Sequence, residues 1–287
     1  MYAITGITGQ VGGALARHLL DAGESVRAVL RDARKGEEWA AQGCEVAVAG
    51  MDDAAALTKA FAGATAVFIL PPPVFDPERG YPEARRLADT LVQALTSARP
   101  GRVLELSTIG AGAAQDNLLS QHTLLEAALR DLPLPLTILR PAWFIENAAW
   151  DVASARDEGV IRSFLAPTDR PVPMVATADI GRVAAELIRE DWSGQRVVEL
   201  EGPRRVSPDG LAVAFAAALG KPVRAEPVPR ESWEGLFRSQ GMKNPGPRIR
   251  MLDGFNEGWI EFRDGGRHAL KGRIEAAEVI AGLVARG

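Results

Sequence analysis

Three glycines near the start of the chain have the spacing of a phosphate-binding turn. Gly6, Gly9 and Gly12 follow the apolar run YAIT and precede a helical pattern. In that context the first glycine permits a tight turn, the second lets backbone amides approach a pyrophosphate, and the third lets the helix pack on the strand. The start of the helix adds free N–H groups. We therefore expect a dinucleotide here rather than a purely structural turn, bound by Gly6, Thr8, Gly9, Gln10, Val11 and Gly12.

The charge after the second apolar run indicates which dinucleotide is bound. A carboxylate at this point would repel a ribose 2′-phosphate, but the chain has Arg31, with Arg34 and Lys35 close behind. A guanidinium can bind a phosphate through two parallel hydrogen bonds. This pattern favours NADP(H) over NAD(H), although Asp32 could compete for the charge of Arg31. The alternative is a solvated, basic start of the second helix.

The elements that must position these residues alternate regularly along the first half of the chain. Short apolar runs separated by single helical stretches predict a parallel sheet that is covered on both faces. The fold class is thus α/β, a doubly wound Rossmann sheet with a smaller C-terminal substrate lobe, and ligands are expected beyond the carboxyl ends of the strands. The six expected strands are residues 2–5, 25–30, 44–49, 65–70, 102–107 and 136–140.

The regular alternation of apolar runs and helical stretches ends after about Pro141, where a Pro-rich segment follows. Later patterns predict a helix capped by Thr177, a strand QRVVELEGP, a helix opening on Ser207, an edge strand KPVRAEPVP and a final helix from about Gly272. We expect residues 1–142 plus about 174–202 to form the NAD(P)-binding domain. The smaller substrate-side lobe would then comprise about 143–173 plus 203–287.

Composition limits the classes of partner. The net charge of −4 gives no reason to expect a basic face for nucleic acid, and no apolar stretch is long enough to span a bilayer. The single cysteine, Cys44, fits a reducing compartment, and no cluster has metal-ligand spacing. We expect a cytoplasmic monomer or homodimer that acts on a small molecule and binds no metal.

Several motifs occur together in a recognisable order: TGITGQVGG, Arg31, VFILPPP, LELSTIGA, LTILRPAWFIEN and VATADIGRVAAELI. Over residues 1–200 the chain resembles the NmrA-like family of atypical short-chain dehydrogenases. That family includes NADPH-dependent quinone reductases, reductases of plant phenylpropenoids, and regulators that bind NADP without turning it over. The resemblance implies cofactor contacts from Leu70, Pro71 and Pro72 near the ribose, from Ser107 and Thr108 at the nicotinamide, and from Pro141, Ala142 and Phe144 above it.

Each of these contacts has a simpler alternative. The prolines could merely make a rigid exit from a strand. The Ser107 hydroxyl could be satisfied by the turn that follows it. The chain also departs from the family at Ala49-Gly50, where members often carry Gly-Asp, so a side-chain contact to adenine is not expected.

A second departure concerns catalysis. Ordinary short-chain dehydrogenases place Tyr and Lys four residues apart on the helix after strand five, where the Tyr protonates the substrate. Counting back from LTILRP puts Leu118 at the Tyr position and His122 at the Lys position, and neither Tyr2 nor Tyr81 lies on that helix. His122 is the remaining candidate, as a ribose contact or as a proton donor. Its alternative role is a helix histidine bonded to a backbone carbonyl.

The substrate is expected to meet an apolar, aromatic site. Trp143, Phe144, Asn147 and Met174 are its candidate residues, although aromatics in such a lobe are mostly core. These features favour an NADPH-dependent oxidoreductase that transfers hydride to a small apolar quinone-like or unsaturated substrate without the Tyr–Lys pair. The alternative is an NADP(H)-binding redox sensor that docks on a protein partner. A sugar-nucleotide epimerase needs the missing pair and is the weakest candidate.

Overall fold

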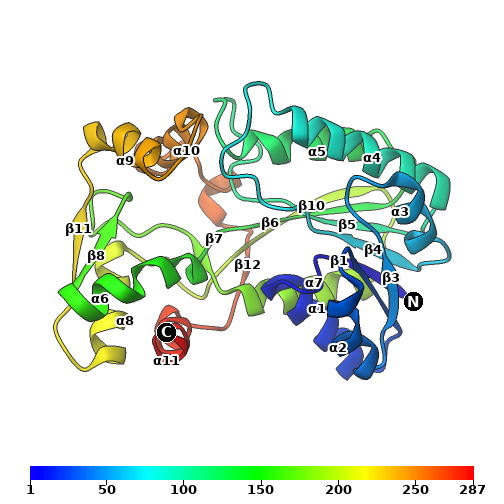
Figure 1. The fold of residues 1–287 in the computed structure, drawn as a ribbon, viewed down its shortest axis with the longest axis horizontal. Coiled ribbons are helices and arrows are strands. Elements are labelled where there is room, and N and C mark those ends of the chain that lie inside the picture. The colour runs from blue at the N-terminus through cyan, green and yellow to red at the C-terminus, as the bar shows by residue number, and fades with distance from the viewer.

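A single eight-stranded parallel sheet runs through the molecule (Figure 1). The structure is a computed structural model that describes residues 1–287. The strand order is β12-β10-β6-β5-β4-β1-β2-β3, with every pair parallel. The strands are β1 (Tyr2–Thr5), β2 (Val26–Leu30), β3 (Glu45–Val48), β4 (Ala66–Ile69), β5 (Val103–Leu106), β6 (Leu136–Pro141), β10 (Gln195–Glu201) and β12 (Leu270–Lys271).

Helices cover both faces of this sheet (Figure 1). One face carries α1 (Gln10–Asp21), α2 (Gly36–Ala41) and α7 (Thr177–Arg189), and the other carries α3 (Ala54–Phe61), α4 (Pro82–Ala98) and α5 (Ser120–Arg130). A short 3₁₀ turn, η1 (Ala33–Lys35), leads into α2. The doubly wound Rossmann architecture expected from the alternating apolar runs is therefore confirmed.

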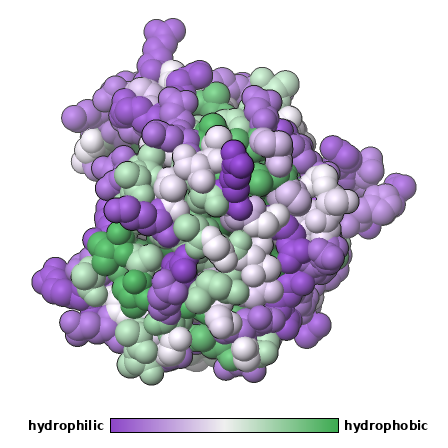
Figure 2. Space-filling view, turned by 90° about the vertical axis from the view of Figure 1, so that its right-hand side faces the viewer, coloured by the Kyte–Doolittle hydropathy of each residue, from purple (hydrophilic) through white to green (hydrophobic).

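The central strands are apolar at nearly every position because both of their faces are buried. On β1, Tyr2 and Ile4 belong to the core beneath α1 and α7, whereas Ala3 belongs to the core beneath α3 and α4. The edge strand β3 differs, since Val48 is 54% exposed. On the side of the molecule near β3, hydrophilic residues stand out around the outline and are intermixed with apolar ones over the middle (Figure 2). None of the helices is long and apolar enough to cross a bilayer.

Two small parallel pairs lie beyond the carboxyl ends of the main strands. β7 (Trp143–Phe144) pairs with β9 (Met174–Val175), and β8 (Val160–Ser163) pairs with β11 (Arg224–Pro227), the predicted Pro-bearing strand. The helical elements of this region are η2 (Ile145–Asp151), α6 (Val152–Glu158), α8 (Pro208–Leu219), η3 (Arg230–Ser232), α9 (Trp233–Ser239), α10 (Gly246–Glu257), η4 (Arg263–Gly266) and α11 (Ala276–Arg286).

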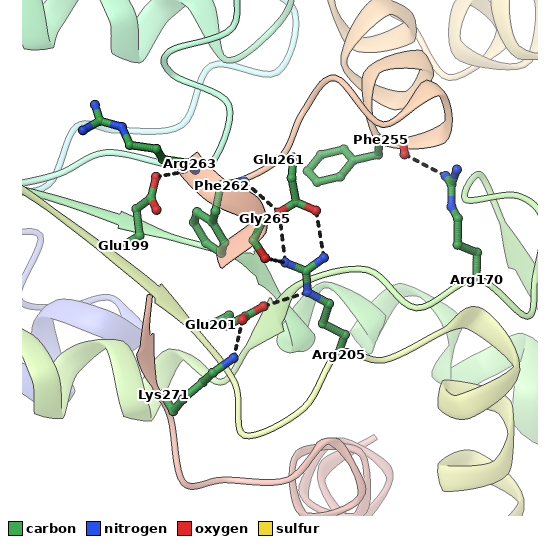
Figure 3. Close-up of polar contacts among 10 residues, drawn as sticks. All are labelled: Arg170, Glu199, Glu201, Arg205, Phe255, Glu261, Phe262, Arg263, Gly265 and Lys271. Carbon is green, nitrogen blue, oxygen red and sulfur yellow. Dashed lines mark hydrogen bonds and ion pairs between the residues drawn. The ribbon is translucent and has the colours of Figure 1, made fainter. Parts of the chain in front are cut away.

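A charged network fastens this region to the sheet edge (Figure 3). Arg205 donates to Glu201 at the end of β10 at 3.0 Å and to Glu261 at 2.7 and 3.0 Å. Lys271 on β12 also pairs with the buried Glu201 carboxylate. Residues 201–205, 261 and 271 are thus joined at the point where the chain returns to the sheet.

Two helix boundaries differ from the prediction. Thr177 is the first residue of α7 rather than its N-cap, and its backbone N–H donates to the side chain of Glu146 at 2.9 Å. The last helix begins at Ala276 and not near Gly272, because Gly272 pairs its N–H with Glu201 and its successors donate to Asp179. By contrast, Ser207 caps α8 as expected, accepting from Gly210 N–H at 3.0 Å.

Glycine at position 181 lets α7 lie directly against α1. A Cβ there would come within 2.4 Å of the Ala14 Cβ and 2.8 Å of the Leu15 nitrogen, so the helices would have to separate. We expect Gly181→Ala to lower the free energy of unfolding by about 1–3 kcal/mol, the usual cost of overpacking, as measured by urea denaturation. Gly235→Ala is the matched control, since nothing lies within 4 Å of its added Cβ. Equal stabilities for the two variants would contradict this account of the helix contact.

Candidate functional site

The glycine turn lies between β1 and α1. Gly6 has φ +64°, a left-handed conformation suited to glycine, and its carbonyl accepts from Gly9 N–H at 2.9 Å. A Cβ on Gly12 would lie 2.3 Å from that same carbonyl oxygen. No side chain caps α1, so the first N–H groups of the helix remain available to an anion. The turn therefore fits the pyrophosphate of a dinucleotide.

The surface next to this turn is basic. A cavity of about 480 Å³ opens beside it, lined by Ile7, Thr8, Gly9, Gly13, Arg17, Arg34, Lys35, Glu38 and Trp39. The Arg17 guanidinium lies 6.0 Å from the centre of the Trp39 ring. Three cations and a row of free amides at one cavity are suited to phosphate groups.

Asp32 pairs with Arg34 and not with Arg31. The Arg34 side chain donates to the Asp32 carboxylate at 3.2 and 3.3 Å, and these hydrogen bonds lower the pKa of Asp32. The expected competition for the charge of Arg31 is therefore absent. Arg31 is exposed, makes no ion pair, and lies outside the residues that line the cavity.

The exit of β4 covers the glycine turn. The Leu70 side chain lies over Gly6, with its Cδ2 2.6 Å from the position of an added Cβ. Its N–H donates to the Thr5 hydroxyl at 2.8 Å, and that hydroxyl donates to Phe68 O at 3.0 Å. Pro71 is half-buried and Pro72 is exposed. Leu70 and Pro71 thus form one wall beside the turn.

A buried polar layer separates α5 from the ends of β5 and β6. Ser107 is 3% exposed, and its hydroxyl donates to Glu126 at 2.5 Å. Glu126 also accepts from Arg140 at 2.8 and 2.5 Å, a bidentate ion pair. The Ser107 hydroxyl is therefore satisfied by a helix carboxylate and not by the turn that follows it. Thr108, the next residue, is half-buried.

His122 lies in the first turn of α5, with Leu118 buried just before the helix. Its Nδ1 atom is buried and has no hydrogen-bond partner, so no backbone carbonyl holds it. Both carboxylate oxygens of Glu105, on β5, are likewise buried without a partner. Burial raises the pKa of Glu105 to about 7, because the opposing effects of His122 and Arg140 do not offset the loss of water.

The segment after β6 carries the candidate substrate residues. Trp143 and Phe144 are half-buried, and the Trp143 ring meets Phe255 edge-on at 5.1 Å. Asn147 is exposed and makes no hydrogen bond, whereas Met174 is 1% exposed and packs in the core. Pro141 is buried, and its carbonyl accepts from Ile109 N–H at 2.8 Å.

Glu146 is a site residue that sequence reasoning missed. Its carboxylate accepts from the Thr177 hydroxyl at 2.7 Å, and that hydroxyl lies 3.0 Å from the Gln10 side-chain oxygen. One contact chain thus joins the segment after β6, the start of α7 and the glycine turn. Glu105 and Glu126 were also missed, although an acid within the apolar run VLEL signals a buried charge. No three His, Cys, Asp or Glu side chains lie where they could together hold a metal ion.

A doubly wound parallel sheet with this turn at its first crossover is the architecture of a dinucleotide-binding protein. The chain belongs to the NAD(P)H-binding family, whose model matches residues 6–191. The resemblance to NmrA-like proteins and the expectation of an NAD(P)H cofactor are thereby confirmed.

Two of the relatives are named as a reductase and an oxidoreductase. The chain is 30% identical over 228 residues to the (4-alkanoyl-5-oxo-2,5-dihydrofuran-3-yl)methyl phosphate reductase of Streptomyces griseus, covering 79% of this chain and 76% of the relative. It is 27% identical over 246 residues to quinone oxidoreductase 2 of Escherichia coli, covering 84% and 82%. The family match and the names of these relatives confirm the expected class, an NAD(P)H-dependent oxidoreductase.

Solved structures share the fold over the whole chain. The NADPH complex of an Escherichia coli NADPH-dependent quinone oxidoreductase superposes with a TM-score of 0.82 at 24% identity, covering 99% of each chain. The NADP(H) complex of a Citrobacter triphenylmethane reductase gives a TM-score of 0.80 at 22% identity, covering 98% and 99%.

Burial of Glu105 makes a prediction about stability and pH. Its pKa is raised on folding, so the folded state holds the proton more tightly than the unfolded state does. The contribution of protonated Glu105 to stability is therefore fully present below the unfolded pKa, near 4–5, and is lost as pH rises through about 7. In urea unfolding from pH 5 to pH 8.5, we expect Glu105→Gln to lose this decline, worth about 3 kcal/mol or less. Asp151, whose burial raises its pKa to about 6, contributes a smaller pH-dependent decline in stability to both proteins. Parallel pH curves for the two proteins would contradict the prediction.

Proposed function

We propose that this protein is an NADPH-dependent oxidoreductase that transfers hydride to a small, apolar, quinone-like or unsaturated substrate. The observation that carries the proposal is the glycine turn with its basic cavity at one end of the sheet, joined through Thr177 and Glu146 to the aromatic segment after β6. Residues 1–142 with about 174–202 would bind the cofactor. Residues about 143–173 with 203–287 would face the substrate.

The cations after β2 support a preference for the 2′-phosphorylated cofactor. Arg31 is exposed and free of any ion pair, and Arg34, Lys35 and Arg17 lie at the cavity beside the turn. Asp32 is engaged with Arg34, and Glu38 is the one carboxylate among the residues that line the cavity with these cations. Because phosphate binding by guanidinium groups is strong and directional, these residues would select NADP(H).

The chemistry needs little from the protein beyond position and exclusion of water. Bound NADPH supplies the hydride. Leu70 and Pro71 would confine the cofactor on one side, and Pro141 and Phe144 on the other, while Trp143 and Phe144 would offer an apolar surface to a planar acceptor. The Tyr position is Leu118, so the proton would come from His122 or water. The printed names of relatives, a quinone oxidoreductase and an NAD(P)H azoreductase, agree with flat unsaturated acceptors.

A second function, an NADP(H)-binding sensor without turnover, has one specific observation behind it. A nitrogen metabolite regulation-like protein of Gibberella fujikuroi is 28% identical over 236 residues, covering 71% of this chain. The absence of a Tyr–Lys pair fits this function too. In that case the protein would change a surface on binding the cofactor and would dock on a protein partner.

Turnover assays separate these two functions. We expect the purified protein to oxidise NADPH, followed by its absorbance, with members of a panel of quinones, azo dyes and enones. The unsaturated centres of these acceptors take up hydride readily, so the reaction does not require a strong acid from the protein. Silence across the panel, combined with micromolar binding of NADP⁺ by calorimetry, would favour the sensor. Absence of any binding heat from either nicotinamide cofactor would refute both.

Cofactor choice is tested at Arg31. We expect Arg31→Ala to weaken NADPH binding about tenfold or more, since a charge-assisted hydrogen bond to the 2′-phosphate is worth about 1.5–3 kcal/mol, and to leave NADH binding nearly unchanged. Calorimetric titration with both cofactors measures this ratio. Arg86→Ala, an exposed residue of α4 on the far side of the sheet, is the control. An equal loss for NADPH and NADH would show that Arg31 does not read the 2′-phosphate.

A further inference from the structure

A carboxylate is enclosed in the middle of the sheet without a partner. Glu105 lies on β5, between β4 and β6, and is 0% exposed. Neither of its oxygens accepts a hydrogen bond from a protein group. An acid in such surroundings costs several kcal/mol unless a neighbour or a proton compensates it. Glu105 therefore calls for a compensating donor nearby.

The neighbouring charges leave one group free to supply it. The charged and titratable groups that act on Glu105 are His122 and Glu126 from α5 and Arg140 from β6. Glu126 and Arg140 are committed to each other through two short hydrogen bonds, and Ser107 is committed to Glu126. Only His122 remains.

His122, like Glu105, has a buried polar atom without a hydrogen-bond partner. Its Nδ1 atom is buried without a partner, whereas its Nε2 atom is not among the enclosed unpartnered atoms. The ring belongs to the first turn of α5, next to the carboxyl ends of β5 and β6, where the nicotinamide is expected. One enclosed ring nitrogen and two enclosed carboxylate oxygens thus lie at the same helix–sheet contact, close enough for His122 to lower the pKa of Glu105.

We propose that Glu105 is a positioning residue that holds the Nδ1 side of His122 and so directs Nε2 toward the substrate as a proton donor. This inference rests on the proposed function for its catalytic consequence, but the pairing itself is independent of any substrate. A carboxyl group behind an imidazole fixes the tautomer and the orientation of the ring.

The proton balance of the step is simple. At rest the pair holds two protons, one on Nε2 and one shared between Nδ1 and the Glu105 carboxyl. Bound NADPH would supply the hydride, and His122 would give its Nε2 proton to the oxygen anion left on the reduced acceptor. The shared proton then stays on Nδ1 opposite an ionised Glu105, and a solvent proton restores Nε2. The net change is acceptor plus NADPH plus one proton to reduced acceptor plus NADP⁺. The pKa of Glu105, about 7, lets the pair hold this proton at neutral pH.

Nuclear magnetic resonance tests the pairing directly, because the chain has three histidines. Long-range ¹H–¹⁵N spectra of the full chain report the tautomer and hydrogen bonding of each ring. In Glu105→Gln we expect the Nδ1 signal of His122 to change, since the carboxyl group that shares its proton is gone. The signals of His18 and His268, both exposed, should stay unchanged and serve as internal controls. Unchanged ring signals of His122 in the folded variant would overturn the proposal.

A reciprocal variant keeps the test decisive if Glu105→Gln does not fold. In His122→Asn, ¹³C titration of the Glu105 carboxyl should show a higher pKa than in the wild type, because the ring no longer favours the ionised form. An unchanged value overturns the pairing.

Kinetics then addresses the catalytic role. We expect kcat of the wild type to fall as pH rises past about 7, where Glu105 ionises. In Glu105→Gln this fall of kcat should be absent, and KM should change little. Coincident pH profiles would overturn the role of Glu105 in proton donation. If the wild type reduces no acceptor at all, the proposed function fails, while the histidine ring spectra still decide the pairing.

Discussion

The close approach of α1 to the first turn is the constraint on which the rest of the structure depends. Gly12 has no space for a Cβ against the Gly6 carbonyl, and Gly6 takes a backbone conformation that other residues avoid. That contact aims the free amides of α1 at the space beyond the sheet. It also sets how far α1 lies from the sheet. Gly181 then allows α7 to pack directly against α1. The start of α7 then reaches Glu146, so the aromatic segment after β6 is placed from the glycine turn.

The polar layer under α5 is unusual for a helix that packs on a parallel sheet. Ser107, Glu126 and Arg140 satisfy one another, so their burial costs little beyond their loss of water. Glu105 and His122 are not satisfied in this way. An apolar pair at those two positions would pack with no electrostatic penalty. The free-energy cost of burying Glu105 and His122 therefore arises near the strand ends where a dinucleotide fold places its reacting groups. This supports a chemical role for the pair.

The second half of the chain supplies a wall for the site and an anchor for that wall. Trp143 meets Phe255, and Arg205 joins Glu201 at the end of β10 to Glu261. The aromatic surface is thus carried by segments tied to the sheet edge. Under the proposed function, this wall would present its aromatic surface to the acceptor.

The sequence by itself determined the sheet, its covering helices and the cofactor turn, because those follow from local patterns: apolar runs with a period set by burial, and glycines at fixed spacing. It also singled out His122 as a candidate, by its place on the helix after β5. Only the tertiary structure decided the partners of each polar group. It gave Asp32 to Arg34, Ser107 to Glu126 and Thr177 to Glu146, and it enclosed Glu105 beside His122. Apart from Asp32 and Arg34, which are two residues apart, these pairings join residues that lie on different elements, so no local pattern encodes them. They depend on how closely the elements pack and on which charges lose their water together.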